Sequence, residues 1–462
     1  IRKIKSALVN GNQYLFTRRN HMSIKDIVCK FNYEISKFAK RKSEFCNCPG
    51  RDFSRNRKQN FESVIRSILS LNGGSLTNEL LKIHQFSPDS PSASAFIQQR
   101  AKLSENAFPY LFQELNSTFD RDCRYDGYRL IAVDGSHIHV PNNPEDKDSF
   151  VQSRADEHFH NEFHLNAFWD IMQGTFLDAV VQKYRNQNED RALIEMLERS
   201  SPADMILVCD RGYEAYNNIA HIQQADHKYV MRIKEQGSFG IADGLELPDK
   251  DEFDMYTELS LTRKGSLEIK TLAKRYKNKY RWLPSHVHFD YLPPSKKNES
   301  AVFFILKFRI LRIKIRENQY EMLLTNLPSD KFPPHKLKEI YSMRWGIETS
   351  FRDLKYIVGM LKFHSKKSCF VTQEIYAALI MHNMTVVVSQ CVEIHQRKRK
   401  YEYKIRFSNA VCIVKSLLTG GVSPPAAEML IRKNLSPIRP NRGYPRKKTP
   451  LKAKIQFVYR IA

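Results

Sequence analysis

Four polar side chains recur at helical spacing in the stretch YSMRWGIETSFRDLK, residues 341–355. They are Tyr341, Arg344, Glu348 and Lys355. Their separations of three, four and seven positions are near whole turns, so the four would form one ladder along an amphipathic helix. A carboxylate with cations one and two turns away can bind a metal ion while the cations bind a phosphodiester. The alternative is a surface helix in which Arg344 and Glu348 form an ordinary exposed ion pair.

Two aspartates follow short apolar runs elsewhere in the chain. Asp134 follows LIAV and Asp210 follows MILVC, so each is expected where a buried strand ends. Ligands usually bind at that edge of an α/β sheet, and an acid placed there must be solvated, paired or bound to metal. Together with Glu348, the two aspartates could hold two Mg²⁺ ions about 3.5–4 Å apart beside a phosphodiester. Asp134 alone is also explained by a turn, because Asp-Gly is a turn signal.

Histidines offer a different kind of metal site. Five of them lie close together in the sequence: His137, His139, His158, His160 and His164. Imidazole is a common zinc ligand, but no further motif in the sequence completes a zinc site. We therefore expect ordinary half-buried strand positions for most of these histidines.

The pattern around the two aspartates is that of alternating strands and helices. A strand is expected from residue 128 to Asp134, and two more lie within residues 163–182 on either side of a turn. A helix over 188–200, a short buried strand within 205–213 that ends at Asp210, another helix and the strand KYVMRIK follow. Three strands, helix, strand, helix and strand is the order of a ribonuclease-H-like α/β layer.

The remaining segments differ in character from this layer. Residues 235–330 alternate in a strand-like way, and the helical pattern resumes only at PHKLKEIYSMRW, so the segment between is expected to be a β-rich insertion. The apolar stretch 375–391 is interrupted by His382 and Asn383 and is short for a membrane span, so it predicts a buried helix. No signal peptide is seen, and a soluble, intracellular protein with no membrane segment is expected.

Both ends of the chain are basic. Near the N-terminus two helical patterns flank the break SPDSP and could form a helix-turn-helix that presents Arg100 and Lys102 to DNA. A helical bundle with a merely solvated polar face explains the same pattern. The C-terminal part carries RKRK at 397–400 and a tail rich in Pro, Lys and Arg, which is expected to be a solvated or DNA-bound arm.

Length and charge agree with a nucleic-acid partner. The 462 residues exceed what one core usually organises, so two or three domains are expected. An excess of 74 Lys+Arg over 50 Asp+Glu gives a formal charge of +24, which favours a polyanion. The eight cysteines show no repeated pair spacing and are expected to be reduced thiols.

Taken together, the motifs resemble those of a known family. Asp134 in VDGS, Asp210 in DRGY and the Y-x2-R-x3-E-x6-K run at 341–355 are similar to the signature of the DDE transposases of the insertion-sequence family named after IS four. The likeness covers roughly residues 50–390 and includes the β-rich insertion.

The resemblance implies a cut-and-paste transposase of DNA. Such an enzyme hydrolyses strand ends, forms and reopens a hairpin on the transposon end, and joins the 3′-hydroxyl to target DNA. Asp134, Asp210 and Glu348 would be the catalytic metal ligands for two Mg²⁺ ions, with Mn²⁺ as a substitute. The residues expected to contact DNA phosphates near the cleaved end are Tyr341, Arg344 and Lys355, while Trp345 would stack on a flipped base.

The resemblance also implies partners and a location. The expected partners are double-stranded DNA at the terminal inverted repeats, target DNA, and a second copy of the chain in a synaptic homodimer. A cytoplasmic, nucleoid-associated protein of a bacterial host is expected.

The fold class expected is α/β, with a ribonuclease-H-like core interrupted by a β-rich insertion domain and flanked by a helical N-terminal DNA-binding region and a helical, basic C-terminal region. The expected segments are a helical DNA-binding region at 1–122, the first part of the core at 123–234, the insertion domain at 235–330, the second part of the core at 331–392 and a basic arm at 393–462. Two alternative functions remain. One is a domesticated DNA-binding protein without catalytic activity, against which the three intact acids argue. The other is a structure-specific nuclease, which needs no strand transfer.

Overall fold

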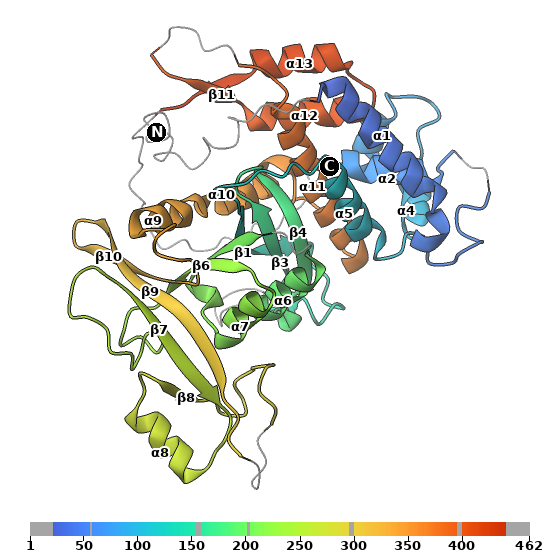
Figure 1. Cartoon of the computed structure of the whole chain (residues 1–462). Coiled ribbons are helices and arrows are strands. Elements are labelled where there is room, and N and C mark those ends of the chain that lie inside the picture. The colour runs from blue at the N-terminus through green and yellow to red at the C-terminus, as the bar shows by residue number, and fades with distance from the viewer. Residues whose placement is uncertain are drawn as a thin grey trace.

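The computed structural model describes residues 22–55, 58–152, 159–200, 204–294, 300–394 and 400–439. Across these residues ten strands form one sheet, in the order β2-β3-β1-β5-β6-β10-β9-β7-β8, with β4 pairing on β3. Helices cover one end of this sheet, and the other end extends away from them as a long, twisted ribbon (Figure 1). The fold is therefore mixed α/β with a large central sheet.

The first half of the sheet follows the order that the sequence predicts. Its antiparallel strands are β1 (Arg129–Val140), β3 (His160–Asp170) and β4 (Thr175–Lys183), and a short strand β2 (Phe150–Val151) pairs with the start of β3. The segments α6 (Glu189–Arg199), β5 (Met205–Cys209), α7 (Tyr216–Gln224) and β6 (Lys228–Ile233) follow. Strand β5 pairs parallel with β1, and β6 pairs parallel with β5. The pairing of β1 with β5 stops at Val133 and Cys209, whereas β1 itself continues to Val140 beside β3, so β1 does not end at Asp134 as the sequence predicts.

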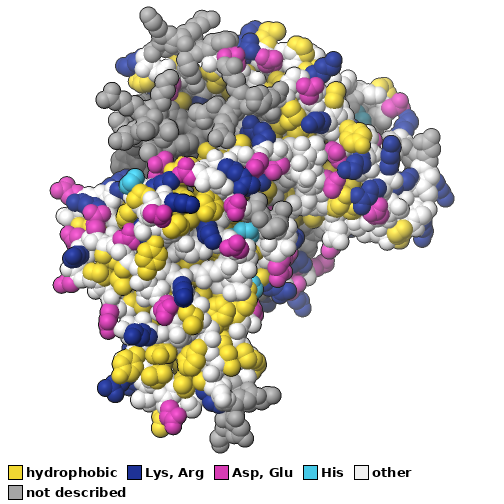
Figure 2. Space-filling view, viewed as in Figure 1, with side chains coloured by type: hydrophobic (Ala, Val, Ile, Leu, Met, Phe, Trp, Pro, Cys, Tyr) yellow, Lys and Arg dark blue, Asp and Glu magenta, His cyan; other side chains and the backbone are white. Residues whose placement is uncertain are grey.

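Residues 235–330 add strands to this same sheet. They form β7 (Phe253–Thr262), α8 (Leu267–Arg275), β8 (Tyr280–Trp282), β9 (Phe304–Arg316) and β10 (Gln319–Thr325). Because β10 pairs antiparallel with β6, the segment continues the central sheet. Apolar side chains are exposed along this extension, among them Tyr256, Leu267 and Ile305, and Figure 2 shows apolar side chains gathered over it.

Helices from both ends of the sequence pack on one face of the first half of the sheet. They are α5 (Ala107–Phe119), α9 (Pro334–Met343), α10 (Trp345–Asp353) and α11 (Ser368–Ser389), and α6 and α7 lie on the opposite face. Helix α11 contains the apolar stretch and is buried, as predicted. Within the described residues, no helix is both long and apolar enough for a membrane span.

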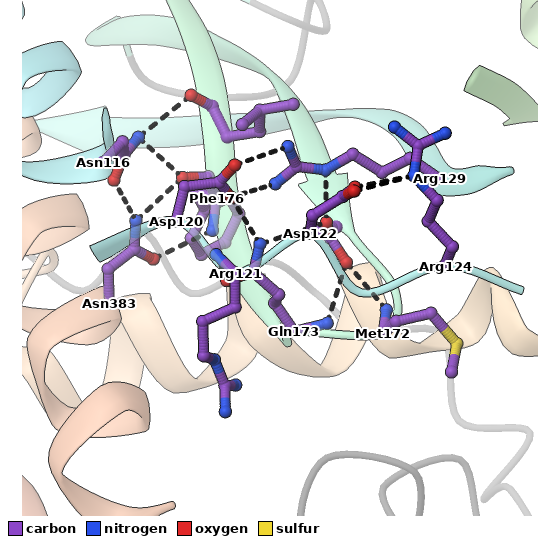
Figure 3. Close-up of polar contacts among 12 residues, drawn as sticks. Asn116, Asp120, Arg121, Asp122, Arg124, Arg129, Met172, Gln173, Phe176 and Asn383 are labelled. Atoms are coloured by element: carbon purple, nitrogen blue, oxygen red, sulfur yellow. Dashed lines mark hydrogen bonds and ion pairs between the residues drawn. The ribbon is translucent and has the colours of Figure 1, made fainter. Parts of the chain in front are cut away.

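A buried polar network fixes α11 and the end of α5 to the sheet (Figure 3). Arg129, at the start of β1, donates from Nε to Asp170 Oδ2 at 2.6 Å and from Nη1 to Asp120 Oδ2 at 3.0 Å. Asn383 of α11 accepts from the backbone N–H of Phe176 at 2.8 Å and donates to its carbonyl oxygen at 2.7 Å. A buried asparagine thus interrupts the apolar helix because the first residues of β4 need a partner there.

The two ends of the chain meet in a helical layer beside α11. The N-terminal helices are α1 (Ile24–Lys40), α2 (Phe61–Ser70), α3 (Leu76–Ile83) and α4 (Ala93–Arg100); short 3₁₀ turns lie at Lys42–Phe45 and Tyr184–Asn186. The C-terminal segment forms β11 (Tyr403–Ile405), α12 (Phe407–Leu418), α13 (Pro424–Lys433) and β12 (Leu435–Pro437). Helix α12 packs against α11, and α13 packs against α1 and α12.

This packing corrects the expectation that residues 393–462 form a basic arm. Lys415 of α12 is buried and donates from Nζ to Leu71 O at 2.6 Å and to Asn72 Oδ1 at 2.8 Å. Burial lowers the pKa of Lys415 to about 8. Residues 403–437 are therefore part of the folded helical layer, and the tail from residue 440 lies outside the described residues.

Candidate active site

Asp134 and Asp210 follow the last paired residues of two adjacent parallel strands. The final pair between β1 and β5 joins Val133 to Cys209, so the two aspartates come directly after it at the same edge of the sheet. Asp210 caps a short 3₁₀ turn, Arg211–Tyr213, and its Oδ1 accepts from Gly212 N at 2.8 Å. Asp134 Oδ1 accepts from its neighbour, Gly135 N, at 2.9 Å. Backbone amides thus orient both carboxylates.

Arg344 joins the third acid to this edge. Its Nη1 lies 3.5 Å from Asp134 Oδ2, and its Nη2 donates to Glu348 Oε1 at 2.8 Å. The arginine is buried, whereas the Glu348 side chain is 38% exposed. One guanidinium therefore lies between Asp134 and the helix glutamate, at the edge of the sheet where Asp210 follows the end of β5.

The helix that carries these residues is interrupted, which differs from the continuous helix expected. Helix α9 ends at Met343, α10 begins at Trp345, and a π-helical turn at Leu354–Val358 follows. Lys355 lies in this π turn, and a π turn shifts the register of the residues that follow it. Tyr341, Arg344 and Glu348 keep helical spacing, while Lys355 does not continue their ladder with α-helical geometry.

The like charges of the three acids affect one another. Burial raises the pKa of Asp134 to about 7, Arg344 opposes this shift, and Asp210 and Glu348 add to it. An oxygen-only set of carboxylates is the donor set that hard divalent cations such as Mg²⁺ prefer, and a cation offsets this repulsion. The residues present therefore fit a divalent metal ion.

The raised pKa of Asp134 predicts a pH dependence of stability. An acid whose pKa is near 4 when unfolded and about 7 when folded destabilises the fold progressively as pH rises between these values. In metal-free protein we expect Asp134→Asn to increase the free energy of unfolding by about 2–4 kcal/mol at pH 8 and to have little effect near pH 4. The free energy of unfolding is measured by urea denaturation between pH 4 and pH 8 in the presence of a chelator, and Asp249→Asn, which changes an exposed acid, is the control. If the free energy of unfolding depended on pH equally in wild type and Asp134→Asn, the raised pKa of Asp134 would be contradicted.

The comparisons with known proteins agree with this geometry. Residues 125–384 match the family described as the transposase DDE domain. The chain belongs to the DDE transposases. Since the match contains Asp134, Asp210 and Glu348, it includes the whole site described above.

The curated relatives of this transposase act for insertion sequence elements. The transposase InsG for insertion sequence element IS4 of Escherichia coli K12 is 22% identical over 371 residues, which cover 76% of this chain and 75% of that protein. The transposase for IS231E of Bacillus thuringiensis subsp. finitimus is 20% identical over 263 residues, 51% of this chain and about half (52%) of that protein. Among solved structures, the piggyBac transposase synaptic complex with hairpin DNA aligns with 90% of this chain and 82% of that chain, at a TM-score of 0.43 and 11% identity.

The other predicted DNA contacts of the transposase differ in exposure. Trp345 is 52% exposed beside Arg344, whose guanidinium carbon lies 5.7 Å from the indole centroid. Tyr341 is buried at the end of α9. Lys355 is half-buried, and burial lowers the pKa of its ammonium, an effect that Glu162 opposes.

Arg100 does not face solvent, which contradicts its predicted DNA contact. It is 1% exposed and donates to Gln373 Oε1 at 2.8 Å and to Glu374 Oε1 at 2.9 Å, both on α11. It therefore fixes α4 to α11 from inside the protein. Lys102 is half-buried and donates to Gln99 Oε1 at 2.9 Å, so it stays a candidate for DNA contact.

Sequence analysis missed the contact that positions the helix carrying Glu348 against the sheet. Gly346 of α10 packs on Trp169 of β3 so closely that a Cβ atom at this position would overlap the indole ring. Trp169 is fully buried, and it sets the distance between α10 and the sheet. The available signal was a glycine in the middle of a helix, which usually marks close packing or a functional role when it is not near a helix end.

Gly346→Ala is accordingly expected to destabilise the transposase by about 1–3 kcal/mol, the usual cost of overpacking. It should also reduce cleavage, because α10 carries Glu348. Gly265→Ala is the matched control, since its Cβ would lie 3.7 Å from the nearest atom, Lys270 Cε. Chemical unfolding and a cleavage assay on both variants measure the effect. An unchanged Gly346→Ala protein would show that α10 is free to shift.

Proposed function

We propose that this transposase moves a DNA element by a cut-and-paste mechanism that passes through a hairpin at the transposon end. The observation that carries the proposal is the placement of Asp134 and Asp210 directly after the last residue pair that joins β1 to β5, with Glu348 linked to Asp134 through Arg344. Three acids converging on one sheet edge suit metal-dependent phosphoryl transfer.

The sheet order supports a ribonuclease-H-like core. Strands β4, β3 and β1 are antiparallel neighbours, and β5 and β6 continue in parallel beyond β1. We propose the core as residues 123–234 and 331–392, with 235–330 as its insertion and 1–122 as a DNA-binding region. The C-terminal region from 393 then consists of a folded helical part and a basic tail.

The chemistry divides among the residues of this edge. Asp134, Asp210 and Glu348 would hold the metal ions, proposed to be two Mg²⁺, and these ions would activate the attacking oxygen and stabilise the leaving one. In the first step a water oxygen attacks a phosphodiester and releases a 3′-hydroxyl on the transposon end. That hydroxyl then attacks the opposite strand, closing a hairpin and freeing the flanking strand.

Arg344 and Trp345 suit the strained DNA of the hairpin step. In the part of the chain that the structure describes, the buried Nε of Arg344 has no acceptor, and a phosphate bound at this edge would supply one. Trp345 exposes its indole beside it and could stack on a base that leaves the helix. Lys355 would bind a phosphate farther along the same strand.

A direct test uses the DNA that flanks the gene. Inverted repeats on both sides would mark the ends, and purified protein would be incubated with intact end fragments and, separately, with pre-nicked ones in Mg²⁺. A denaturing gel that resolves nick, hairpin and joined product should show all three in that order. Nicking without hairpin or joining would favour the structure-specific nuclease, and no cleavage would favour the DNA-binding protein without chemistry.

DNA binding by the proposed transposase should weaken steeply with salt. Residues 440–462 contain seven Lys or Arg and no Asp or Glu. If this tail binds phosphates, truncation after Arg439 should reduce the slope of log K against log salt by up to about 6, since each neutralised phosphate contributes about 0.9. Phe457→Ala with Tyr459→Ala keeps the charge and serves as control. A slope that does not change on truncation would show that the tail makes no phosphate contact.

A further inference from the structure

A second group of metal-ligating side chains lies away from the three acids. It consists of His139 on β1 and His160 and Glu162 on β3, whose ligand atoms all lie within 4.8 Å of one another. Within the described residues, no other three His, Cys, Asp or Glu side chains come together this closely. We propose that these three residues bind a transition-metal ion of the zinc class, which links β1 to β3.

The strand register explains how the group forms. His139 is the direct partner of Glu162 across the antiparallel pair of β1 and β3. His160 and Glu162 are two positions apart on β3, so they point to the same face of the sheet. His160 Nε2 lies 3.1 Å from Glu162 Oε2, and His139 Nδ1 lies 3.7 Å from the same oxygen. All three side chains therefore converge on one point.

Neighbouring groups prepare the donors for a metal ion. His137 contacts the other oxygen of Glu162 through Nδ1, which fixes the orientation of the carboxylate. Although burial opposes it, hydrogen bonds with His137 and His160 hold the pKa of Glu162 at about 2, so the carboxylate is ionised. Burial lowers the pKa of His139, which favours the neutral imidazole that binds metals. The charge of Glu162 in turn opposes the lowering of the Lys355 pKa that burial causes.

The donor set distinguishes this group from the active site. Two imidazoles and one carboxylate are a set that Zn²⁺ uses when a fourth position is left for water or another ligand, whereas Mg²⁺ prefers oxygen ligands. His139 is five residues beyond Asp134 on β1, roughly 17 Å along an extended strand, and an odd separation puts the two side chains on opposite faces. Binding here is therefore independent of the three acids.

The location suggests a structural role for the ion. Strand β1 carries Asp134, and beyond Asp134 its residues pair with β3. An ion bound by one residue of β1 and two of β3 would resist separation of this pair. His139 is exposed, so the ion has a path from solvent.

Metal titration of the full chain tests the proposal. Protein stripped with a chelator would be titrated with Zn²⁺ against a chromophoric chelator, and with Co²⁺ while its visible absorption is recorded. Wild type and the triple variant Asp134→Asn, Asp210→Asn, Glu348→Gln should each bind about one Zn²⁺ per chain with the same affinity, because the second site keeps all its ligands. Zn²⁺ should also raise the melting temperature of both.

Ligand variants identify the site. His139→Asn, at an exposed position, and Glu162→Gln should each weaken Zn²⁺ binding at least about 10-fold and abolish the Co²⁺ spectrum. His335→Asn, an exposed histidine elsewhere, is the control. If Glu162→Gln fails to fold, the Zn²⁺ affinity of His139→Asn alone still tests the proposed site. Undiminished Zn²⁺ affinity in His139→Asn, no Zn²⁺ binding by wild type, or loss of binding in the triple variant would overturn the proposal.

Discussion

Asp134→Asn, Asp210→Asn and Glu348→Gln are each expected to reduce cleavage of transposon-end DNA in Mg²⁺ by about 10³-fold or more, while end binding changes little. Each change removes one negatively charged oxygen ligand and no phosphate-binding cation. A bound metal ion lowers the activation free energy by several kcal/mol because it stabilises the charge of the transition state. Each 1.36 kcal/mol added to the activation free energy slows the reaction about tenfold. Single-turnover cleavage and a gel-shift assay on the same DNA separate the two effects.

Folding controls make this result interpretable. Asp134→Asn is expected to stabilise metal-free protein at pH 8, so loss of its activity would not come from unfolding. Asp249→Asn removes an exposed acid of the insertion and should cleave at the wild-type rate. Cleavage within about tenfold of wild type by any of the three site variants would contradict their role as metal ligands.

The acids of the site were predictable because local rules determine their positions. Asp134 and Asp210 each follow a short apolar run, and a run of this kind predicts a buried strand from the local sequence alone. Strands β1 and β5 then pair in parallel up to Val133 and Cys209, which brings the two aspartates to one edge. Glu348 was predictable from helical spacing with Arg344, and their 2.8 Å ion pair confirms that spacing.

Contacts between distant segments were not predictable in the same way. Arg100 looked like a surface cation, but its partner Glu374 lies 274 positions away, and nothing local distinguishes a buried arginine from an exposed one. Glu162 was overlooked beside the histidines because its partnership with His139 depends on strand register. Lys415 was counted in a basic arm because only the packing of α12 shows that it is buried.

The interrupted helix shows a further limit of periodicity. The stretch 341–355 fits an amphipathic helix, yet the structure divides it at Arg344 and ends it in a π turn. Close packing of Gly346 on Trp169 accompanies this division, and tertiary packing overrides local propensity. The ladder therefore ends before Lys355, whose half-buried ammonium lies near Glu162.

Arg344→Ala is expected to depress hairpin formation and strand transfer roughly 10²-fold more than first-strand nicking. Those two steps bend the DNA backbone sharply and crowd phosphates whose repulsion a guanidinium offsets. Trp345→Ala and Lys355→Ala should show the same pattern with smaller effects, since a stacked base is worth about 1–3 kcal/mol. The measurement is a gel assay on intact and pre-nicked ends that resolves nick, hairpin and joined product.

Matched controls lie on the same helical segment. Arg352→Ala removes an exposed cation of α10, and Tyr356→Ala removes an aromatic side chain that is 72% exposed; both should leave the ratio of hairpin to nick unchanged. Arg344 also separates Asp134 from Glu348, so its loss should lower nicking to some degree through repulsion between the acids. Lys355 and Trp345 do not connect Asp134 to Glu348, so their variants test DNA contact separately from repulsion between the acids. Equal loss at every step in all three variants would refute the hairpin role and leave Glu348 as the residue of this helix that acts in cleavage.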